Sequence, residues 1–151
     1  MTARDDVVIR PVELADLPAL YEHQADPEAV RMADFPARER DAFMVHWRRI
    51  LADGAGVTLA IVAGGRVAGS AVSWRDGDRQ MVGYWIGRDH WGQGLASRGL
   101  AALLAELDER PLYAHVATHN AASIRVLEKA GFTRTDEAIE AGFVYALQRR
   151  R

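Results

Sequence analysis

Three glycines fall within nine residues of this sequence, in the stretch WGQGLASRG that runs from Trp91 to Gly99. Glycine inside a helix or strand costs roughly 0.5–1 kcal/mol relative to alanine, so such a cluster indicates a tight turn or a close approach of the backbone to another group. If a helix begins after the turn, its unpaired N–H groups and partial positive charge can hold phosphate oxygens. The stretch therefore predicts a plain turn, a nucleotide site or another phosphate-binding turn.

Two common nucleotide-binding motifs are not completed here. The dinucleotide pattern Gly-x-Gly-x-x-Gly needs a third glycine where this sequence has Ser97, and it opens a parallel strand–helix–strand unit. The phosphate-binding loop of many nucleotide hydrolases ends in Gly-Lys-Ser/Thr, a tripeptide that occurs nowhere in the chain. Two interpretations of the stretch remain: a simple turn before Leu95, or a binding site for the phosphates of a different ligand.

The elements around this stretch follow from the spacing of the apolar residues. Alternating or short apolar runs predict seven strands, and apolar residues at helical spacing with capping signals predict the helices. The glycine stretch lies between a strand and a helix in this order. The expected strands are Val7–Arg10, Thr58–Ala63, Val67–Trp74, Met81–Gly87, Leu112–Thr118, Phe132–Thr135 and Phe143–Leu147. The first expected helix runs from the Asp16 cap to His23, the second starts at Asp26 and Pro27, and the third contains Phe43 and Leu51 and ends at Gly54. The fourth contains Leu100 and Leu107 and ends near Arg110 and Pro111, and the fifth runs from the Asn120 cap to Gly131.

This order predicts an α+β, or mixed α/β, fold for a single domain of residues 1–151. It consists of the helices before Gly54, an antiparallel meander, and then strand–helix–strand–helix–strand. With 49% hydrophobic and 26% charged residues, the chain has the composition of a soluble globular protein. The formal net charge of −2 gives no electrostatic footprint for nucleic acid.

The absence of cysteine excludes disulfides, thiolate metal sites and a cysteine nucleophile, and it is typical of a reducing compartment. No run of about 18 apolar residues predicts a membrane span, and the first ten residues carry charges where a signal peptide needs an apolar run. We therefore expect a cytoplasmic protein, a monomer or homodimer, with no metal and no membrane or nucleic-acid partner.

Two stretches in order carry a resemblance to a known family. GYWIGRDHWGQGLA (Gly83–Ala96) is followed about 25 residues later by NAASIRVLEKAGF (Asn120–Phe132). Together they resemble the GNAT superfamily of N-acetyltransferases, and within it the Rim-type branch, the ribosomal-protein N-terminal acetyltransferase-like enzymes that acetylate protein N-terminal amines and other primary amines. The family signature Arg/Gln-x-x-Gly-x-Gly/Ala falls on Trp91–Ala96, with the tryptophan that is common in this branch.

The resemblance implies a mostly antiparallel twisted sheet flanked by about four helices, with a splayed strand pair that holds acetyl-CoA. The cofactor's pyrophosphate would lie on backbone amides of the glycine stretch, and its pantetheine arm beside Met81–Gly87 like an added strand. Gly83 and Gly87 mark either a bulge that splays this strand from Leu112–Thr118 or ordinary flexible positions. The cofactor-binding residues implied by the resemblance are Ile86, Gln93, Gly94, Leu95, Ala96, Ser97, Asn120, Ser123 and Arg125.

Several of these residues have a second interpretation. Asn120 can cap the helix that follows it as well as bind the cofactor arm. The branch keeps a serine at Ser123 near the cofactor sulfur, where it would protonate the leaving thiolate as a catalytic residue; otherwise Ser123 is an ordinary first-turn serine. Arg125 either reaches a phosphate or is solvated. Tyr84 and Trp85 alternate across their strand, so one faces the core and the other the cleft, and we expect Trp85 to be the structural one.

The general base is not evident from the sequence. A protonated alkylamine must lose a proton before it attacks, so Asp, Glu or His is expected within reach. Many relatives have glutamates at the positions of Met81 and Arg98, and both carboxylates are missing here. The remaining candidates are His115, His119 and Asp34.

The function implied by the resemblance is acetyl transfer from acetyl-CoA to a primary amine of a peptide N-terminus or a small molecule. The amine would attack the thioester directly in a ternary complex, in agreement with the absence of a cysteine nucleophile. The alternative is a non-catalytic acyl-CoA-binding or partner-binding module on the same fold, suggested by the missing carboxylates. The acceptor is not defined by any motif.

Overall fold

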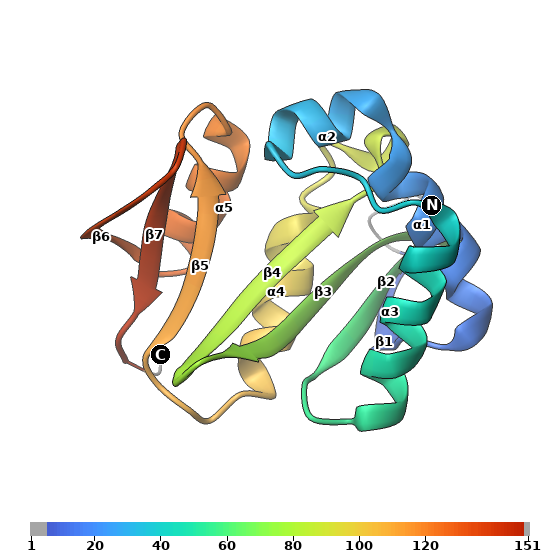
Figure 1. Cartoon of the computed structure of the whole chain (residues 1–151), viewed down its shortest axis with the longest axis horizontal. Helices are drawn as coiled ribbons and strands as arrows, with labels where there is room; N and C mark the ends of the chain where they lie inside the picture. Colours follow the sequence, from blue (N-terminus) through green and yellow to red (C-terminus); the bar gives the residue numbers. More distant parts are fainter. Residues whose placement is uncertain (1–5, 150–151) are drawn as a thin grey trace.

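A seven-stranded sheet forms the centre of the computed structural model, which describes residues 6–149 (Figure 1). Every neighbouring pair in the order β1-β2-β3-β4-β5-β7-β6 is antiparallel except β4 and β5, which run parallel. This sheet confirms the mixed α/β, mostly antiparallel fold expected from the sequence. The strands are β1 (Val7–Pro11), β2 (Thr58–Ala63), β3 (Arg66–Asp76), β4 (Arg79–Ile86), β5 (Leu112–Ala117), β6 (Thr133–Ile139) and β7 (Gly142–Leu147).

Five α-helices cover the sheet within residues 6–149, where about four were expected. The Asp26 carboxylate accepts a hydrogen bond from the Ala29 N–H and the Asn120 side chain accepts one from the Ser123 N–H, so two predicted caps are confirmed. Helices α1 and α3 pack on one face of the sheet, and α4 and α5 on the other. The helices are α1 (Leu17–Ala25), α2 (Pro27–Ala33), α3 (Arg40–Asp53), α4 (Leu95–Ala105) and α5 (Ala121–Lys129), with short 3-10 turns at Leu14–Asp16 and Arg88–His90.

Asp16 does not cap α1 with its side chain, contrary to the sequence prediction. Its buried carboxylate instead accepts two hydrogen bonds from the Arg10 guanidinium, at 2.8 and 2.9 Å, and one from the Glu13 N–H at 2.7 Å. These bonds hold the pKa of Asp16 below its ordinary value, with the Arg10 hydrogen bond as the largest cause. Asp16 therefore connects β1 to the segment before α1 and does not cap the N-terminus of that helix with its side chain.

Two boundaries lie about four or five residues from the prediction, farther than the others. Helix α4 ends at Ala105 instead of near Arg110, because the Glu106 and Leu107 amides bond to carbonyls three residues back and so tighten the last turn. Strand β6 extends to Ile139, four residues past its predicted end. It is an exposed edge strand whose polar residues gave no apolar alternation.

The sheet parts between β4 and β5, as expected. Only two residue pairs join these strands, Gln80 with Leu112 and Met81 with Tyr113, and beyond them the strands diverge (Figure 1). The bulge considered at Gly83 is absent, because β3 and β4 stay in unbroken register. The divergence instead separates two antiparallel halves, β1–β4 and β5-β7-β6, each of which twists with its own partners.

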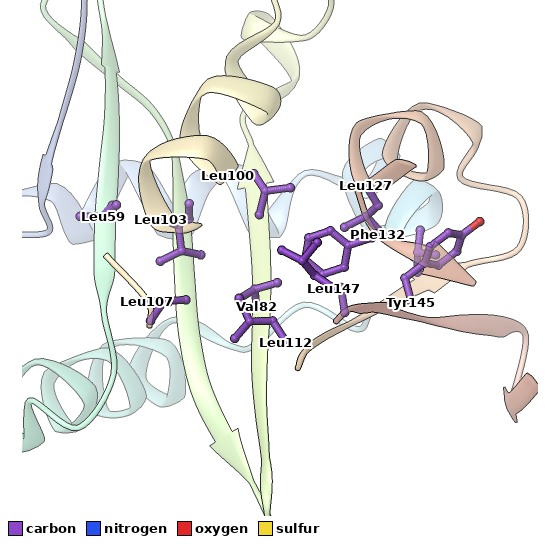
Figure 2. Close-up of a cluster of buried hydrophobic side chains, with 13 residues drawn as sticks. Leu59, Val82, Leu100, Leu103, Leu107, Leu112, Leu127, Phe132, Tyr145 and Leu147 are labelled. Carbon is purple, nitrogen blue, oxygen red and sulfur yellow. The ribbon is translucent and has the colours of Figure 1, made fainter. Parts of the chain in front are cut away.

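One buried cluster spans both halves of the sheet on the α4 and α5 face (Figure 2). Leu100 and Leu103, two of the leucines predicted to form the apolar face of α4, are fully buried. Burying a leucine completely contributes roughly 1.5–3 kcal/mol, so α4 stabilises the junction that the strands leave weak. The labelled members of this cluster are Leu59, Val82, Leu100, Leu103, Leu107, Leu112, Leu127, Phe132, Tyr145 and Leu147. No helix within residues 6–149 is long and apolar enough to cross a membrane.

Candidate active site

A pocket of about 600 Å³ opens where β4 and β5 part. It is lined by the end of β4, the turn before α4, the first turn of α4 and one side of α5 along its length, with α2 on one side. The structure therefore brings together two stretches that are far apart in the sequence. Of the nine predicted cofactor-binding residues, all except Gln93 line the pocket: Ile86, Gly94, Leu95, Ala96, Ser97, Asn120, Ser123 and Arg125.

The glycine stretch makes a left-handed turn that starts α4. Gly92 and Gly94 have φ angles of 80° and 75°, in a region of backbone conformation that residues other than glycine rarely adopt. A Cβ at Gly94 would meet no protein atom within 4 Å, so the backbone conformation explains this glycine and protein packing does not. A side chain there would obstruct only a ligand.

The start of α4 presents free main-chain donors to the pocket. No side chain caps this helix, and its first intrahelical bond runs from the Arg98 N–H to the Gly94 carbonyl at 3.2 Å. The N–H groups of Leu95, Ala96 and Ser97 precede that bond and have no acceptor within the helix. With the helix dipole they form an anion site, which favours the phosphate cradle over the plain turn.

The edge of β4 that faces the pocket is also open. The Gly87 N–H, just after β4, donates to the Ala68 carbonyl of β3 at 2.8 Å. Because main-chain groups alternate in direction along an antiparallel pair, those of Tyr84 and Ile86 point away from β3, toward the gap that β5 leaves. The Ile86 carbonyl accepts a hydrogen bond from the Trp91 indole at 2.9 Å. The main-chain N–H and C=O of Tyr84 and the N–H of Ile86 are left to form hydrogen bonds with an extended ligand.

Ser123 is paired with Tyr84 in the pocket. The Tyr84 hydroxyl lies 2.6 Å from the Ser123 Oγ, in a hydrogen bond that either hydroxyl can donate, and 3.2 Å from the Ser123 carbonyl oxygen, which is a second possible acceptor for the phenol proton. Burial raises the pKa of Tyr84 to about 12, although the Ser123 hydrogen bond lowers it, so the phenol keeps its proton at neutral pH. The two hydroxyls form a proton-donating pair that the sequence does not reveal.

Trp85 points to the other face of the sheet. Its indole N–H donates to the His23 carbonyl at 3.1 Å, and its ring makes an edge contact with Phe35 at a centroid distance of 6.4 Å. This fixed position agrees with the structural role expected for Trp85, although both it and Tyr84 line the pocket. His23 also packs against Gly87, where a Cβ would lie 2.6 Å from the imidazole.

The titratable groups that line the pocket are mainly basic side chains. Arg125 and Lys129 come from α5 and His90 from the turn before α4, and no carboxylate is among the lining residues that the structure describes. The sequence did not indicate His90, Lys129 or the α2 side as parts of the pocket, and it placed Trp91 in the family signature but not among the cofactor-binding residues. Pro27 after Asp26 predicts α2 itself but not where the helix lies.

The three candidate bases lie off the pocket lining. Asp34 is exposed at the left-handed end of α2, and the His119 ring nitrogen lies 2.8 Å from the Arg31 carbonyl. His115 is exposed on β5. At the two positions where relatives carry glutamate, Met81 is buried and Arg98 is exposed on α4. Within residues 6–149 no group of three or more His, Asp or Glu side chains could hold a metal ion.

Solved structures share this fold. RimL, a ribosomal L7/L12 α-N-protein acetyltransferase solved with coenzyme A, superposes with a TM-score of 0.75 at 20% identity over 95% of this chain and 94% of its own. The protein yncA of Salmonella typhimurium, solved with acetyl-CoA, gives 0.76 at 22% identity over 95% and 94%. An acetyltransferase from Agrobacterium tumefaciens gives 0.79 at 21% identity over 95% and 91%.

Sequence comparison identifies the family independently of these superpositions. No curated protein sequence is similar enough to this chain to count as a relative. The family model described as the acetyltransferase (GNAT) domain matches residues 6–133, from the start of β1 to the start of β6. That match covers both motif stretches and most of the chain. The protein therefore belongs to the GNAT family of acetyltransferases.

Proposed function

We propose that this protein transfers an acetyl group from acetyl-CoA to a primary amine, as an N-acetyltransferase of the Rim-type branch. The observation that carries the proposal is the convergence on one pocket of the free α4 amides, the open β4 edge and the Tyr84–Ser123 pair. The solved relatives RimL and yncA, which hold coenzyme A and acetyl-CoA, support the choice of cofactor. The acceptor is a peptide N-terminus or a small amine.

The residues present fit this cofactor. The amides of Leu95, Ala96 and Ser97 would hold its pyrophosphate, and Arg125 and Lys129 add positive charge on the facing helix. The open main-chain groups of β4 would hold the amides of the pantetheine arm. When bound, acetyl-CoA supplies an acetyl group activated as a thioester.

The Tyr84–Ser123 pair would supply the proton for the leaving group. The neutral acceptor nitrogen forms a bond to the acetyl carbon while the carbon–sulfur bond breaks, the sulfur leaves with the bonding electrons, and the nitrogen loses its surplus proton to solvent. Ser123 donates its hydroxyl proton to that sulfur and recovers one from Tyr84, which solvent reprotonates. The raised pKa of Tyr84 keeps this proton in place before transfer.

The experiment is to follow thiol release from acetyl-CoA with a panel of amines and N-terminal peptides, against a control without acceptor. We expect release that depends on acceptor, intersecting initial-rate plots, and no acetylated protein after mixing with acetyl-CoA alone. The last two results follow from direct attack in a ternary complex, since the chain has no cysteine to carry an acetyl group. A stoichiometric acetyl adduct that passes to an amine would overturn direct attack.

A second candidate function is a non-catalytic acyl-CoA-binding module. The observation in its favour is the absence of a carboxylate among the described residues that line the pocket. Tight binding of acetyl-CoA in calorimetry, with no acceptor-dependent thiol release over the whole panel, would favour it over the enzyme.

A further inference from the structure

His23 is a half-buried histidine in the last turn of α1, outside the pocket lining. Its Nδ1 atom is sealed from solvent and has no hydrogen-bond partner within residues 6–149. Buried polar atoms nearly always have a partner, because an unpaired one keeps the full cost of its desolvation. The Nδ1 of His23 therefore needs an explanation beyond packing.

The imidazole of His23 packs against the main chain of Gly87. A Cβ at Gly87 would lie 2.6 Å from the Cδ2 and 2.7 Å from the Nε2 of this ring, so glycine leaves the room that the ring needs. Gly87 is buried, and its N–H is bonded to the Ala68 carbonyl of β3. The backbone of Gly87 is thus held by β3 and also contacted by His23.

Gly87 begins the segment that leads to the phosphate site. It precedes the 3-10 turn Arg88–His90, and its carbonyl accepts a hydrogen bond from the His90 N–H at 2.9 Å. His90 and the following Trp91 line the pocket. His23 is not among the lining residues, so it influences the pocket through neighbours such as Gly87.

Two further contacts join the end of α1 to the same part of the molecule. The indole N–H of Trp85 donates to the His23 carbonyl at 3.1 Å, and Asp26 pairs with Arg88 at 3.2 Å. Asp26 also caps α2, the helix on one side of the pocket. A change in the position of His23 would therefore affect the α2 side as well as the turn before α4.

The surroundings of His23 favour its neutral form. Burial is the largest cause that lowers its pKa, and the positive charges of His90 and Arg66 act in the same direction, whereas Asp89 and Glu22 oppose them. The ring is therefore uncharged at neutral pH. The charged and titratable groups around it, from α1, the start of β3 and the 3-10 turn, are Glu22, Asp26, Arg66, Arg88, Asp89 and His90.

We propose that His23 is a proton-sensitive positioning residue: its neutral ring supports the turn at Gly87, and its protonation in mildly acidic solution loosens this turn and weakens coenzyme A binding. An imidazolium carries a proton on both nitrogens, and the sealed Nδ1 has no acceptor for one. To give that proton an acceptor, such as water or the Asp89 carboxylate, the ring must change its position against Gly87. This inference rests on the cofactor site of the proposed function.

The sign of the effect follows from two opposing interactions. The negative phosphates of the cofactor attract an imidazolium, which by itself would strengthen binding in acid. His23 lies outside the pocket, so solvent and salt screen this attraction. The cost of a charge at a sealed atom without a partner is not screened in this way. We therefore expect acid to weaken binding.

The test measures coenzyme A binding by calorimetry at about pH 7.5 and about pH 5, on either side of the ordinary histidine pKa. Wild type is compared with His23→Leu, His23→Gln and the control His46→Gln on α3, a second histidine whose pKa burial lowers and which does not line the pocket. Between the two pH values, wild-type affinity should fall at least about threefold more than that of either His23 variant. His46→Gln should behave like wild type. The titration of coenzyme A itself is common to all four proteins and cancels in this comparison.

A second measurement needs no ligand. Amide hydrogen exchange over residues 87–94, corrected for its intrinsic pH dependence, should be faster in wild type than in His23→Leu at about pH 5 and equal in the two at about pH 7.5. Circular dichroism verifies that each protein is folded at both pH values.

The same pH dependence of affinity in wild type and both His23 variants would overturn the inference. So would a wild-type affinity that rises in acid relative to the variants, because attraction to the phosphates would then dominate. A pH dependence that disappears only in His90→Gln would assign the proton to the histidine of the pocket lining and also overturn it. Wild-type protein that binds no coenzyme A at either pH would instead reject the proposed function and this inference with it.

Discussion

The hydroxyl of Ser123 shows what residue-level analysis of the sequence can and cannot find. Its position after Asn120 predicts the first turn of a helix, and the Asn120 cap is present. Its partner Tyr84 is 39 positions away, and no local pattern connects the two. The contact exists because the tertiary fold brings β4 and α5 together.

Ser123→Ala should lower kcat by roughly 10²-fold or more, because the leaving sulfur loses its nearest proton donor. Tyr84→Phe should also lower kcat, and the double variant should be no slower than the slower single variant if the two hydroxyls act as a unit. Coenzyme A affinity should hardly change. Single-turnover rates measure the chemical step directly.

The matched control is Tyr145→Phe, which removes a hydroxyl bonded to Glu128 outside the pocket. It should leave the chemical step unchanged. A Ser123→Ala variant with the parent's single-turnover rate would return Ser123 to the role of an ordinary helix-start residue.

At the scale of elements, the turn into α4 combines a conformational and a ligand-binding role. Gly94→Ala puts a methyl group on a left-handed residue and into the open space beside the helix N-terminus. We expect a loss of about 1 kcal/mol in the free energy of unfolding from backbone strain. We also expect at least a tenfold weaker binding of coenzyme A, measured by calorimetry.

Gly77→Ala separates the two effects. Gly77 has a φ of 62° in the turn between β3 and β4, where a Cβ would meet no protein atom within 4 Å, and it does not line the pocket. It should lose similar stability and keep full affinity. Equal coenzyme A affinity in the two variants would contradict the phosphate cradle.

Which elements the sequence predicts depends on how local their signals are. The leucine spacing of α4 and the cap of α5 are local, and both helices are found. The full length of β6 has no local signal in the sequence, because its exposed polar residues are held in the strand by pairing with β7. The contribution of α2 to the pocket follows from tertiary packing, so no spacing within Pro27–Ala33 predicts it.

At the scale of the whole molecule, the two halves of the sheet depend on helix packing for their connection. Leu103 is fully buried in the cluster that spans both halves, whereas Leu104 is only partly buried. Leu103→Ala should reduce the free energy of unfolding by about 2–5 kcal/mol, because it removes contacts and leaves a cavity. Leu104→Ala, in the same helix, should cost clearly less.

Urea denaturation followed by circular dichroism measures both variants under the same conditions. Equal losses for Leu103→Ala and Leu104→Ala would mean that the cluster does not carry the connection between the halves. The position of Leu103 on the apolar face was predictable from its spacing. That this face bridges a parting in the sheet was not.

The parting of β4 and β5 gives the protein two additional sheet edges in its interior. An exposed edge of unpaired main-chain groups invites strands from other chains and so favours aggregation. Here the edges diverge beyond Met81 and Tyr113, and α2 lies across the wide end, held near β5 by the contact of His119 with the Arg31 carbonyl (Figure 1). A slender, extended molecule that pairs with these main-chain groups would therefore also cover the edges against strands of other chains.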